Sequence, residues 1–183
     1  MSPTRLLVLG VVKSFQPVHG YDVRRELLSW RADEWAHINP GSIYHALKGL
    51  ARDGLIEPVP TTEPSARPEK TAYKLTADGE TEFIALLRVS LWQVTKSPLD
   101  LHVGLSFFGF LSRAELLALL RSRIAQLDAG VTSMEFVIAD RWEPRHVVEH
   151  FHLTVGQMRA EAHWAGAFVD RLERGEYRTA DDI

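Results

Sequence analysis

The clearest pattern in the chain is a helical repeat of apolar residues between two helix-boundary signals, at about residues 40–53. Asn39 is a good cap for the free N–H groups of a first turn, and Pro40 suits the first helical position. The apolar residues recur at intervals of four and three: Ile43, Leu47 and Leu50. Gly54 favours the left-handed conformation that ends many helices. The pattern predicts a short amphipathic helix with one buried face.

The opposite face of this predicted helix carries a different set of residues at helical spacing. They are Gly41, Tyr44, His45, Lys48 and Arg52. A short helix that presents hydrogen-bond donors, an aromatic hydroxyl and two cations suits a groove of DNA. An ordinary amphipathic helix with a solvated face explains the same pattern, because helical periodicity is common.

The segments after this helix favour the first interpretation. Two short β-compatible runs occupy residues 57–61 and 71–75, and prolines confine the first to a sheet edge. Residues 62–70 between them are polar and carry Arg67 and Lys70. A helix followed by a basic-tipped hairpin is typical of a winged helix-turn-helix. In that motif the helix enters the major groove and the wing lies along the phosphates or the adjacent minor groove.

Two helices are predicted before the recognition segment. Residues 4–15 are apolar on most sides, so this helix should lie at the centre of the N-terminal part. Residues 21–30 form an amphipathic helix, and Tyr21 at its start either contacts a phosphate or packs against the first helix. Trp30 and Trp35 flank a polar connection and are expected to cover the edge of the core.

The remainder of the chain predicts helices only. Thr76 is a good cap for a fourth helix over residues 77–94, and a short, very apolar piece follows at 99–110. Ser112 and Glu115 form a capping box, so a fifth helix starts there and ends near Pro144.

The last helix has a heptad seam, spaced 3, 4, 3, 4, 3, 4 and 3. Its members are Val148, Phe151, Val155, Met158, Ala162, Ala165, Val169 and Leu172. Gly156 and Gly166 would let neighbouring backbones approach closely. The long helices offer more apolar surface than a thin three-helix layer covers, so we expect a two-fold homodimer. Packing against the fifth helix within one chain is the alternative.

Four short stretches, in this order, resemble the signatures of PadR-type transcriptional regulators. They are HGYDV (19–23), PGSIYHAL (40–47), GLI (54–56) and YKLTADG (73–79). The resemblance implies a mainly α fold with a small β-wing: a winged helix-turn-helix DNA-binding domain over residues 1–76 and an antiparallel helical dimerisation and effector domain over 77–183. His45 stands where the family often has proline, and Gly49 where a basic residue is common, so a relative's operator sequence cannot be transferred.

The amino-acid composition limits the classes of protein to which the chain can belong. The 183 residues are 45% hydrophobic and 25% charged, which is typical of globular proteins. The absence of cysteine excludes disulfides and thiolate zinc sites and fits a reducing cytoplasm. The apolar run at residues 6–12 is too short for a membrane span and lacks a following cleavage pattern, so it indicates a core helix.

The net charge of −3 is unevenly distributed. Residues 1–75 hold ten Lys+Arg against eight Asp+Glu, giving +2, and residues 76–183 hold eleven against sixteen, giving −5. The asymmetry fits a DNA-facing N-terminal part and a body that stays away from phosphates.

One motif indicates chemistry of another kind. His146, Glu149 and His150 match H-x-x-E-H, in which two histidines on one helix face bind zinc beside a glutamate that activates water. Val148 belongs to the heptad seam, however, so the histidines flank a packing helix. A zinc-dependent hydrolase is therefore a remote alternative. The chain has no G-x-S-x-G, P-loop or G-x-G-x-x-G motif.

Trp92 lies near the end of the fourth predicted helix. In some PadR-type relatives a tryptophan near this place lines a pocket for flat aromatic compounds, and an indole face can stack on such a ligand. Plain interface packing is the alternative. Trp92 is accordingly a candidate effector-binding residue.

We therefore expect a cytoplasmic, dimeric winged-helix repressor that is not an enzyme and needs no cofactor. Its partners would be double-stranded operator DNA, a second copy of itself and a small aromatic ligand, with no membrane. The expected DNA-binding residues are Ser42, Tyr44, His45 and Lys48 on the recognition helix, Arg67 and Lys70 on the wing, and Thr4, Arg5 and Tyr21 as phosphate anchors. The operator would be an inverted repeat. A protein-interaction module whose winged helix has lost DNA binding is the alternative.

Overall fold

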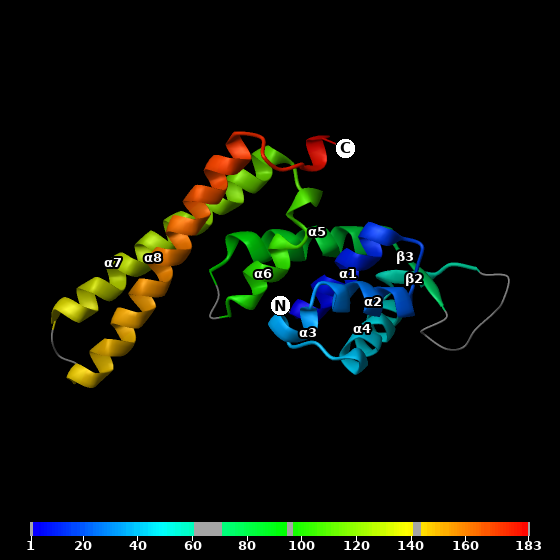
Figure 1. Cartoon of the computed structure of the whole chain (residues 1–183), viewed down its shortest axis with the longest axis horizontal. Coiled ribbons are helices and arrows are strands. Elements are labelled where there is room, and N and C mark those ends of the chain that lie inside the picture. Colours follow the sequence, from blue (N-terminus) through cyan, green and yellow to red (C-terminus); the bar gives the residue numbers. More distant parts are fainter. Residues whose placement is uncertain (1, 61–70, 95–96, 141–143, 183) are drawn as a thin grey trace. The chain divides into compact units, whose positions relative to one another are not determined.

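The computed structural model describes residues 2–60, 71–94, 97–140 and 144–182, and its elements are mostly helices (Figure 1). In chain order they are α1 (Pro3–Phe15), β1 (Val18–His19), α2 (Gly20–Ser29), α3 (Ala32–Trp35), α4 (Pro40–Arg52), β2 (Ile56–Pro58), β3 (Ala72–Leu75), α5 (Ala77–Trp92), α6 (Leu99–Leu105), the 3₁₀ turn η1 (Phe108–Phe110), α7 (Arg113–Asp140), α8 (Arg145–Glu173) and the 3₁₀ turn η2 (Ala180–Asp182). The predicted mainly α fold with a small wing sheet and a helical C-terminal region is confirmed. None of the helices in these ranges combines the length and the apolar character needed to cross a bilayer.

The chain divides into two compact units. The first comprises Met1–Ser90 and Ser97–Phe107, and the second comprises Leu91–Lys96 and Phe108–Ile183. The first unit therefore extends beyond residue 76. The predicted boundary at residue 76, between a DNA-binding domain and a dimerisation and effector domain, stays a prediction.

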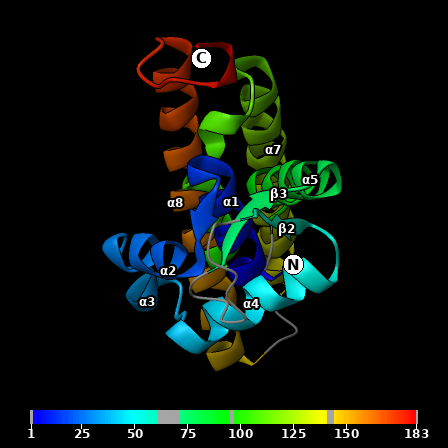
Figure 2. The ribbon, with the colours of Figure 1, turned by 90° about the vertical axis from the view of Figure 1, so that its right-hand side faces the viewer.

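Helix α1 is the centre of the first unit. Its residues from Leu6 to Val12 are buried, and it contacts α2, α4, α6 and β3 (Figure 2). A Cβ at Gly10 would lie 2.3 Å from Cζ of Phe107, so only glycine lets this ring lie directly on α1. The predicted central helix is thus the element on which the other parts of the unit pack.

The sheet of the first unit has three antiparallel strands in the order β1-β3-β2. Val18 is paired with Tyr73, and Ile56 is paired with Leu75. The hairpin of β2 and β3 was predicted, whereas β1 was not, because two residues are too short to show a period. The single turn α3 was also read as a connection.

The junction between α4 and α5 uses three of the residues that the sequence patterns single out. Gly54 has φ +72° and ends the α4 segment. The Thr76 hydroxyl donates to the carbonyl of Gly54 (2.7 Å) and accepts from the N–H of Gly79 (3.0 Å), so Thr76 caps α5 as predicted. A Cβ at Gly79 would lie 1.9 Å from the carbonyl oxygen of Leu55, so the close approach requires glycine.

In the second unit, α7 and α8 run side by side as a long antiparallel pair (Figure 1). Much of the predicted heptad seam is buried within this chain, at Val155, Ala165, Val169 and Leu172. The close approach of the two helices is at Gly130, where a Cβ would lie 3.1 Å from Sδ of Met158. Among the described residues, no atom lies within 4 Å of a Cβ placed at Gly156 or Gly166.

A buried arginine of the second unit connects α7, α8 and the C-terminal end of α5. Arg123 of α7 is 2% exposed, and its Nε lies 2.6 Å from the Glu161 carboxylate of α8. Its Nη1 donates to the carbonyls of Gln93 (2.7 Å) and Leu91 (3.4 Å). Arg123 therefore satisfies carbonyls at the C-terminal end of α5, where a cation is favoured.

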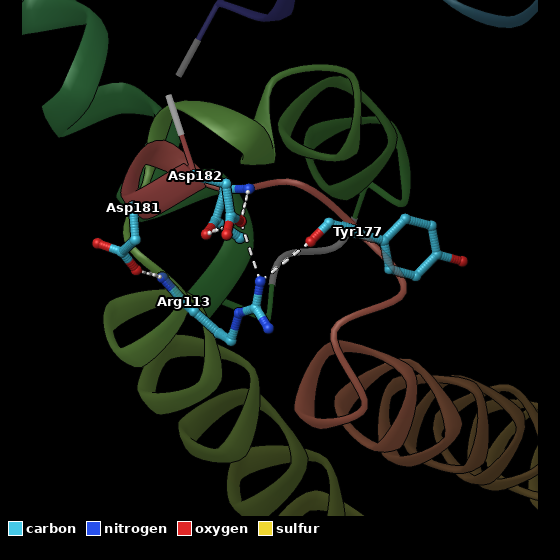
Figure 3. Close-up of polar contacts among 5 residues, drawn as sticks. Arg113, Tyr177, Asp181 and Asp182 are labelled. Atoms are coloured by element: carbon cyan, nitrogen blue, oxygen red, sulfur yellow. Dashed lines mark hydrogen bonds and ion pairs between the residues drawn. The ribbon is translucent and has the colours of Figure 1, made fainter.

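The C-terminal segment returns to the start of α7 (Figure 3). The N–H of Arg113 donates to Asp181 (2.8 Å), and the Arg113 guanidinium contacts Asp182 (3.0 Å) and the carbonyl of Tyr177 (3.3 Å). Hydrogen bonds from the N–H and hydroxyl of Thr179 and the Arg113 cation lower the pKa of Asp182. This network fixes the chain end on the first turn of α7.

Candidate nucleic-acid interface

Helix α4 begins with a complete capping box. The Asn39 side chain accepts from the N–H of Ser42 (2.8 Å), and the N–H of Asn39 donates to the Ser42 hydroxyl (3.1 Å). Pro40 occupies the first helical turn, where its missing N–H has no intrahelical partner to lose. The start of this helix is thus fixed by local sequence.

The two faces of α4 differ as the pattern predicts. The inward side chains are fully buried: Ile43, Leu47 and Leu50. On the outward face His45 and Lys48 are exposed and Tyr44 is half-buried. Among the described residues, none of these three outward side chains has a hydrogen bond or ion pair. The outer face of α4 is therefore free to contact another molecule.

Ser42 differs from the other predicted contact residues. Its hydroxyl accepts from the N–H of Asn39 and donates to the Asn39 carbonyl (2.7 Å). The hydroxyl proton is thus used within the protein, and the remaining lone-pair capacity is all that it can offer to DNA.

Arg5 and Thr4 lie at the start of α1, and both are half-buried. Nη1 of Arg5 lies 2.7 Å from Oδ2 of Asp53, at the C-terminal end of α4. The Arg5 hydrogen bond, assisted by Arg52 at 3.3 Å, holds the pKa of Asp53 below its ordinary value of 3.8. Arg5 is therefore engaged by an acid in the free protein.

Helix α2 presents an aromatic hydroxyl and two arginines. Tyr21 is 51% exposed, and the Arg25 guanidinium lies 5.7 Å from its ring centroid. Arg25 also pairs with Asp22 (2.7 Å). Arg24 is half-buried, and its Nε has no hydrogen-bond partner among the described residues. The sequence analysis did not single out Arg24, because an unsatisfied donor is visible only in the fold.

The wing is described only at its base. Strands β2 and β3 pair Glu57 with Lys74, whose side chains form an ion pair of 3.0 Å. Arg67 and Lys70, the predicted wing contacts, lie outside the described residues. The hairpin begins and ends where the sequence placed it, within one or two residues.

The histidines of the H-x-x-E-H motif lie at the start of α8. His146, Glu149 and His150 are exposed. Over the described ranges, no group of three or more histidine, cysteine or acidic side chains is arranged to hold a metal ion. The motif thus lacks a third protein ligand there.

Trp92 is the last residue of α5 and belongs to the second unit. Its side chain is 38% exposed, and its carbonyl accepts a hydrogen bond from Nε2 of Gln126 (2.8 Å). The indole surface is accessible in the free chain, which is compatible with either an interface or a ligand contact.

The N-terminal part of the chain matches a known family model. The match is to the transcriptional regulator PadR-like family and covers residues 8–85, which include α2, α4 and the sheet. No curated protein matches the sequence.

Several solved structures are similar to this chain. The PadR-like transcriptional regulator BC1756 from Bacillus cereus is 19% identical, over 94% of this chain and 99% of that chain, with a TM-score of 0.39. Bacillus subtilis PadR in complex with operator DNA is 19% identical over 90% and 97% (TM-score 0.40). The same protein in complex with p-coumaric acid is 17% identical over 93% and 99% (TM-score 0.38).

Proposed function

We propose that the chain, whose residues 8–85 match the transcriptional regulator PadR-like family, is a dimeric PadR-like repressor that binds an inverted-repeat operator. The observation that carries the proposal is the outer face of α4. A helix with fixed ends, a buried apolar face and unpaired Tyr44, His45 and Lys48 outside has the form of a major-groove reader. Regulators of this kind act through binding, so we propose no catalytic role.

We propose that His45 and Lys48 contact base edges or the phosphates beside them. Tyr44 would add a hydroxyl contact at the groove edge, and Ser42, whose proton is already donated, would act only as an acceptor. Their spacing supports this assignment, because residues three and four apart share one helix face.

The phosphate contacts would come from the flanking elements. Thr4 and Tyr21 lie at the starts of α1 and α2. Contacts from such positions to the DNA phosphates would fix the register of the protein on the duplex. Arg5 would exchange its pairing with Asp53 for a phosphate oxygen. Arg24 joins this set, because α2 packs against α4 and the Arg24 Nε lacks an acceptor in the described part of the chain. Arg67 and Lys70 would serve as wing contacts.

We propose a two-fold dimer through the second unit. Much of the apolar seam of α8 is buried against α7 within the chain. The residues that could form a dimer are therefore the apolar residues that stay exposed. Phe136 of α7 is 75% exposed and Leu153 of α8 is 61% exposed. A contiguous exposed apolar patch commonly marks an association surface, and we propose that these two residues belong to such a patch. Two-fold symmetry would place the recognition helices about 34 Å apart on one side of the duplex.

Trp92 is proposed as a contact for a small aromatic effector that releases the operator. An effector can change DNA affinity only if it binds one arrangement of the dimer better than another. We propose a cytoplasmic location, because the target of such a regulator is the chromosome.

A salt-dependent gel-shift titration on the DNA upstream of the gene for this protein tests the proposal. We expect retardation at low salt and a log–log decrease of affinity with salt, as phosphate contacts release counterions. A complete lack of retardation at low salt would favour the protein-interaction module. Zinc bound stoichiometrically to protein purified without a histidine tag would favour the hydrolase.

A further inference from the structure

His45 lies in the middle of the exposed face of α4. After Pro40 at the first position, the exposed residues of this helix are Gly41, His45, Lys48 and Arg52. They are spaced four, three and four residues apart, so they form one stripe along the helix. Among the described residues, the His45 side chain has no hydrogen bond, ion pair or ring contact. Its imidazole is therefore placed to meet whatever binds to the stripe.

The stripe carries cations and no acid. No residue of α4 is an aspartate or a glutamate, and Lys48 follows His45 by three residues on the same face. The first acid after the helix, Asp53, already pairs with Arg52 at 3.3 Å and with Arg5 at 2.7 Å. A proton on His45 would add a positive charge beside Lys48, and a like charge disfavours the charged form of a group. The free protein therefore favours the neutral imidazole.

The elements that pack against α4 are α1, α2 and β2, and most of their charged side chains are paired. The pairs are Arg5–Asp53, Lys13–Glu80, Asp22–Arg25 and Glu57–Lys74. The other titratable groups of these elements are Tyr21, Arg24, whose Nε has no acceptor among the described residues, and Glu26, which accepts the indole N–H of Trp30 at 3.0 Å. None of these residue types ordinarily changes charge between about pH 5 and 8, whereas histidine does.

The other histidines of the first unit lie outside these four helices and strands. They are His19, His37 and His102. Within α4 and the elements packed on it, His45 is thus the group whose charge responds to pH near neutrality.

Contact with DNA would reverse the electrostatic preference of His45. Phosphate oxygens are negative, and an opposite charge within about 4–6 Å favours the charged form of a group. The imidazolium ion donates hydrogen bonds from both ring nitrogens, whereas neutral imidazole donates from one and accepts at the other. Phosphate oxygens, and the N7 and O6 atoms of guanine in the major groove, are all acceptors. DNA in front of α4 therefore favours the protonated form.

We propose that DNA binding by this chain takes up one proton per subunit, on His45, so that affinity for DNA rises as the pH falls. The inference rests on the proposal that the outer face of α4 reads DNA. The proton comes from the solvent and converts imidazole into imidazolium, and no other bond forms or breaks. Because such coupling is reciprocal, DNA that favours the proton is bound more tightly when the proton is present.

The test is fluorescence anisotropy of the full chain with labelled DNA from upstream of its gene, at constant ionic strength, from about pH 8 to about pH 5.5. The wild type should bind about ten-fold more tightly per subunit at the lower pH, since a neighbouring opposite charge commonly has an effect of this size. His45→Gln is neutral throughout and should lose this gain. His45→Lys is charged throughout and should bind at pH 8 about as tightly as the wild type at pH 5.5.

His163→Gln is the matched control. His163 is an exposed histidine of α8 in the second unit, and within the described ranges it too has no hydrogen bond or ion pair. This variant should follow the wild type at every pH. Calorimetry of DNA binding in two buffers of different ionisation enthalpy counts the protons directly. The uptake by the wild type should exceed that by His45→Gln and approach one proton per subunit, and circular dichroism at each pH establishes that every variant is folded.

Two results would overturn the inference and leave DNA binding in place. They are a pH dependence of equal size in the wild type and in folded His45→Gln, and tighter binding by the wild type at the higher pH. A lack of binding at every pH, even at low salt, would instead refute the proposed function, and the inference with it.

Discussion

The guanidinium of Arg5 and the carboxylate of Asp53 meet at 2.7 Å, and the contact joins the start of α1 to the end of α4. Helix α1 is the buried centre of the first unit, and α4 carries the proposed DNA-reading face. The pair therefore links the position of α4 to the core. It also occupies an arginine that would otherwise be free to bind a phosphate.

The Arg5–Asp53 pair should make stability depend on acid pH. Because the pKa of Asp53 is lowered from 3.8, its ionised form stabilises the fold above that value, and this contribution is lost as the pH falls through the lower folded-state pKa. Asp53→Asn should therefore be less stable than the wild type near neutral pH. The difference should shrink as the pH falls over about pH 5 to 1.

The measurement is the urea midpoint of unfolding at a series of pH values, with the m-value unchanged. Asp128→Asn is the matched control, since this exposed acid of α7 has no side-chain ion pair within the described residues. A constant difference between wild type and Asp53→Asn at every pH would show that the carboxylate charge has no part in the effect.

Lys48→Ala should weaken operator binding. If Lys48 contacts a phosphate, the slope of log affinity against log salt should become about one unit less steep; if it contacts a base, affinity should decrease by about 1–3 kcal/mol and sequence preference should relax. Fluorescence anisotropy over a range of salt concentrations distinguishes these outcomes. Lys13→Ala is the control, because Lys13 lies on α1 and pairs with Glu80 at 2.7 Å. Equal affinity and slope for wild type and Lys48→Ala would remove Lys48 from the interface.

Gly49 offers a gain-of-function prediction. A Cβ at this position would meet no atom of the described ranges within 4 Å, and the residue lies in the interior of α4, one turn after His45. Gly49→Ala should stabilise the protein by about 0.5–1 kcal/mol, because glycine is unfavourable inside a helix.

Gly49→Lys should give a similar gain in stability and, unlike Gly49→Ala, should also strengthen DNA binding through an added cation. Thermal unfolding and anisotropy on the same two variants separate the effects. Equal DNA affinity for the two variants would indicate that this flank of α4 lies away from the phosphates.

Helix α4 was predictable because its signals are local. The Asn39–Pro40 start, the apolar repeat and Gly54 all act within one short segment, and the structure begins and ends α4 at Pro40 and Arg52. The capping threonine at the start of α5 was predictable for the same reason.

The features that were not predicted from the sequence depend on contacts between residues that are distant in the chain. Strand β1 and the turn α3 are too short to show a period, and β1 exists because it pairs with β3. Arg123 is a buried charge beside an apolar stripe, and its role depends on carbonyls about thirty residues away. A cavity beside Trp30 and Trp35 is lined partly by His102 of α6. From the sequence alone it could not be distinguished from a covered edge of the core.

The dimer proposal predicts that charge on the exposed apolar residues of the second unit will separate the subunits. The double variant Phe136→Glu, Leu153→Glu should have the mass of a monomer by light scattering at concentrations where the wild type has the mass of a dimer. Phe15→Glu makes the same kind of change at a 48% exposed phenylalanine of the first unit and should leave the mass unchanged. A monomeric wild type at micromolar concentration would refute the dimer.

The central claim is that two copies of the outer face of α4 read DNA together. Selection of binding sites from random double-stranded DNA tests it most directly. We expect enrichment of an inverted repeat whose half-site centres lie about one helical turn apart, and weaker enrichment in Lys48→Ala. Recovery of no enriched sequence by the wild-type protein, or of one with no inverted symmetry, would contradict the account.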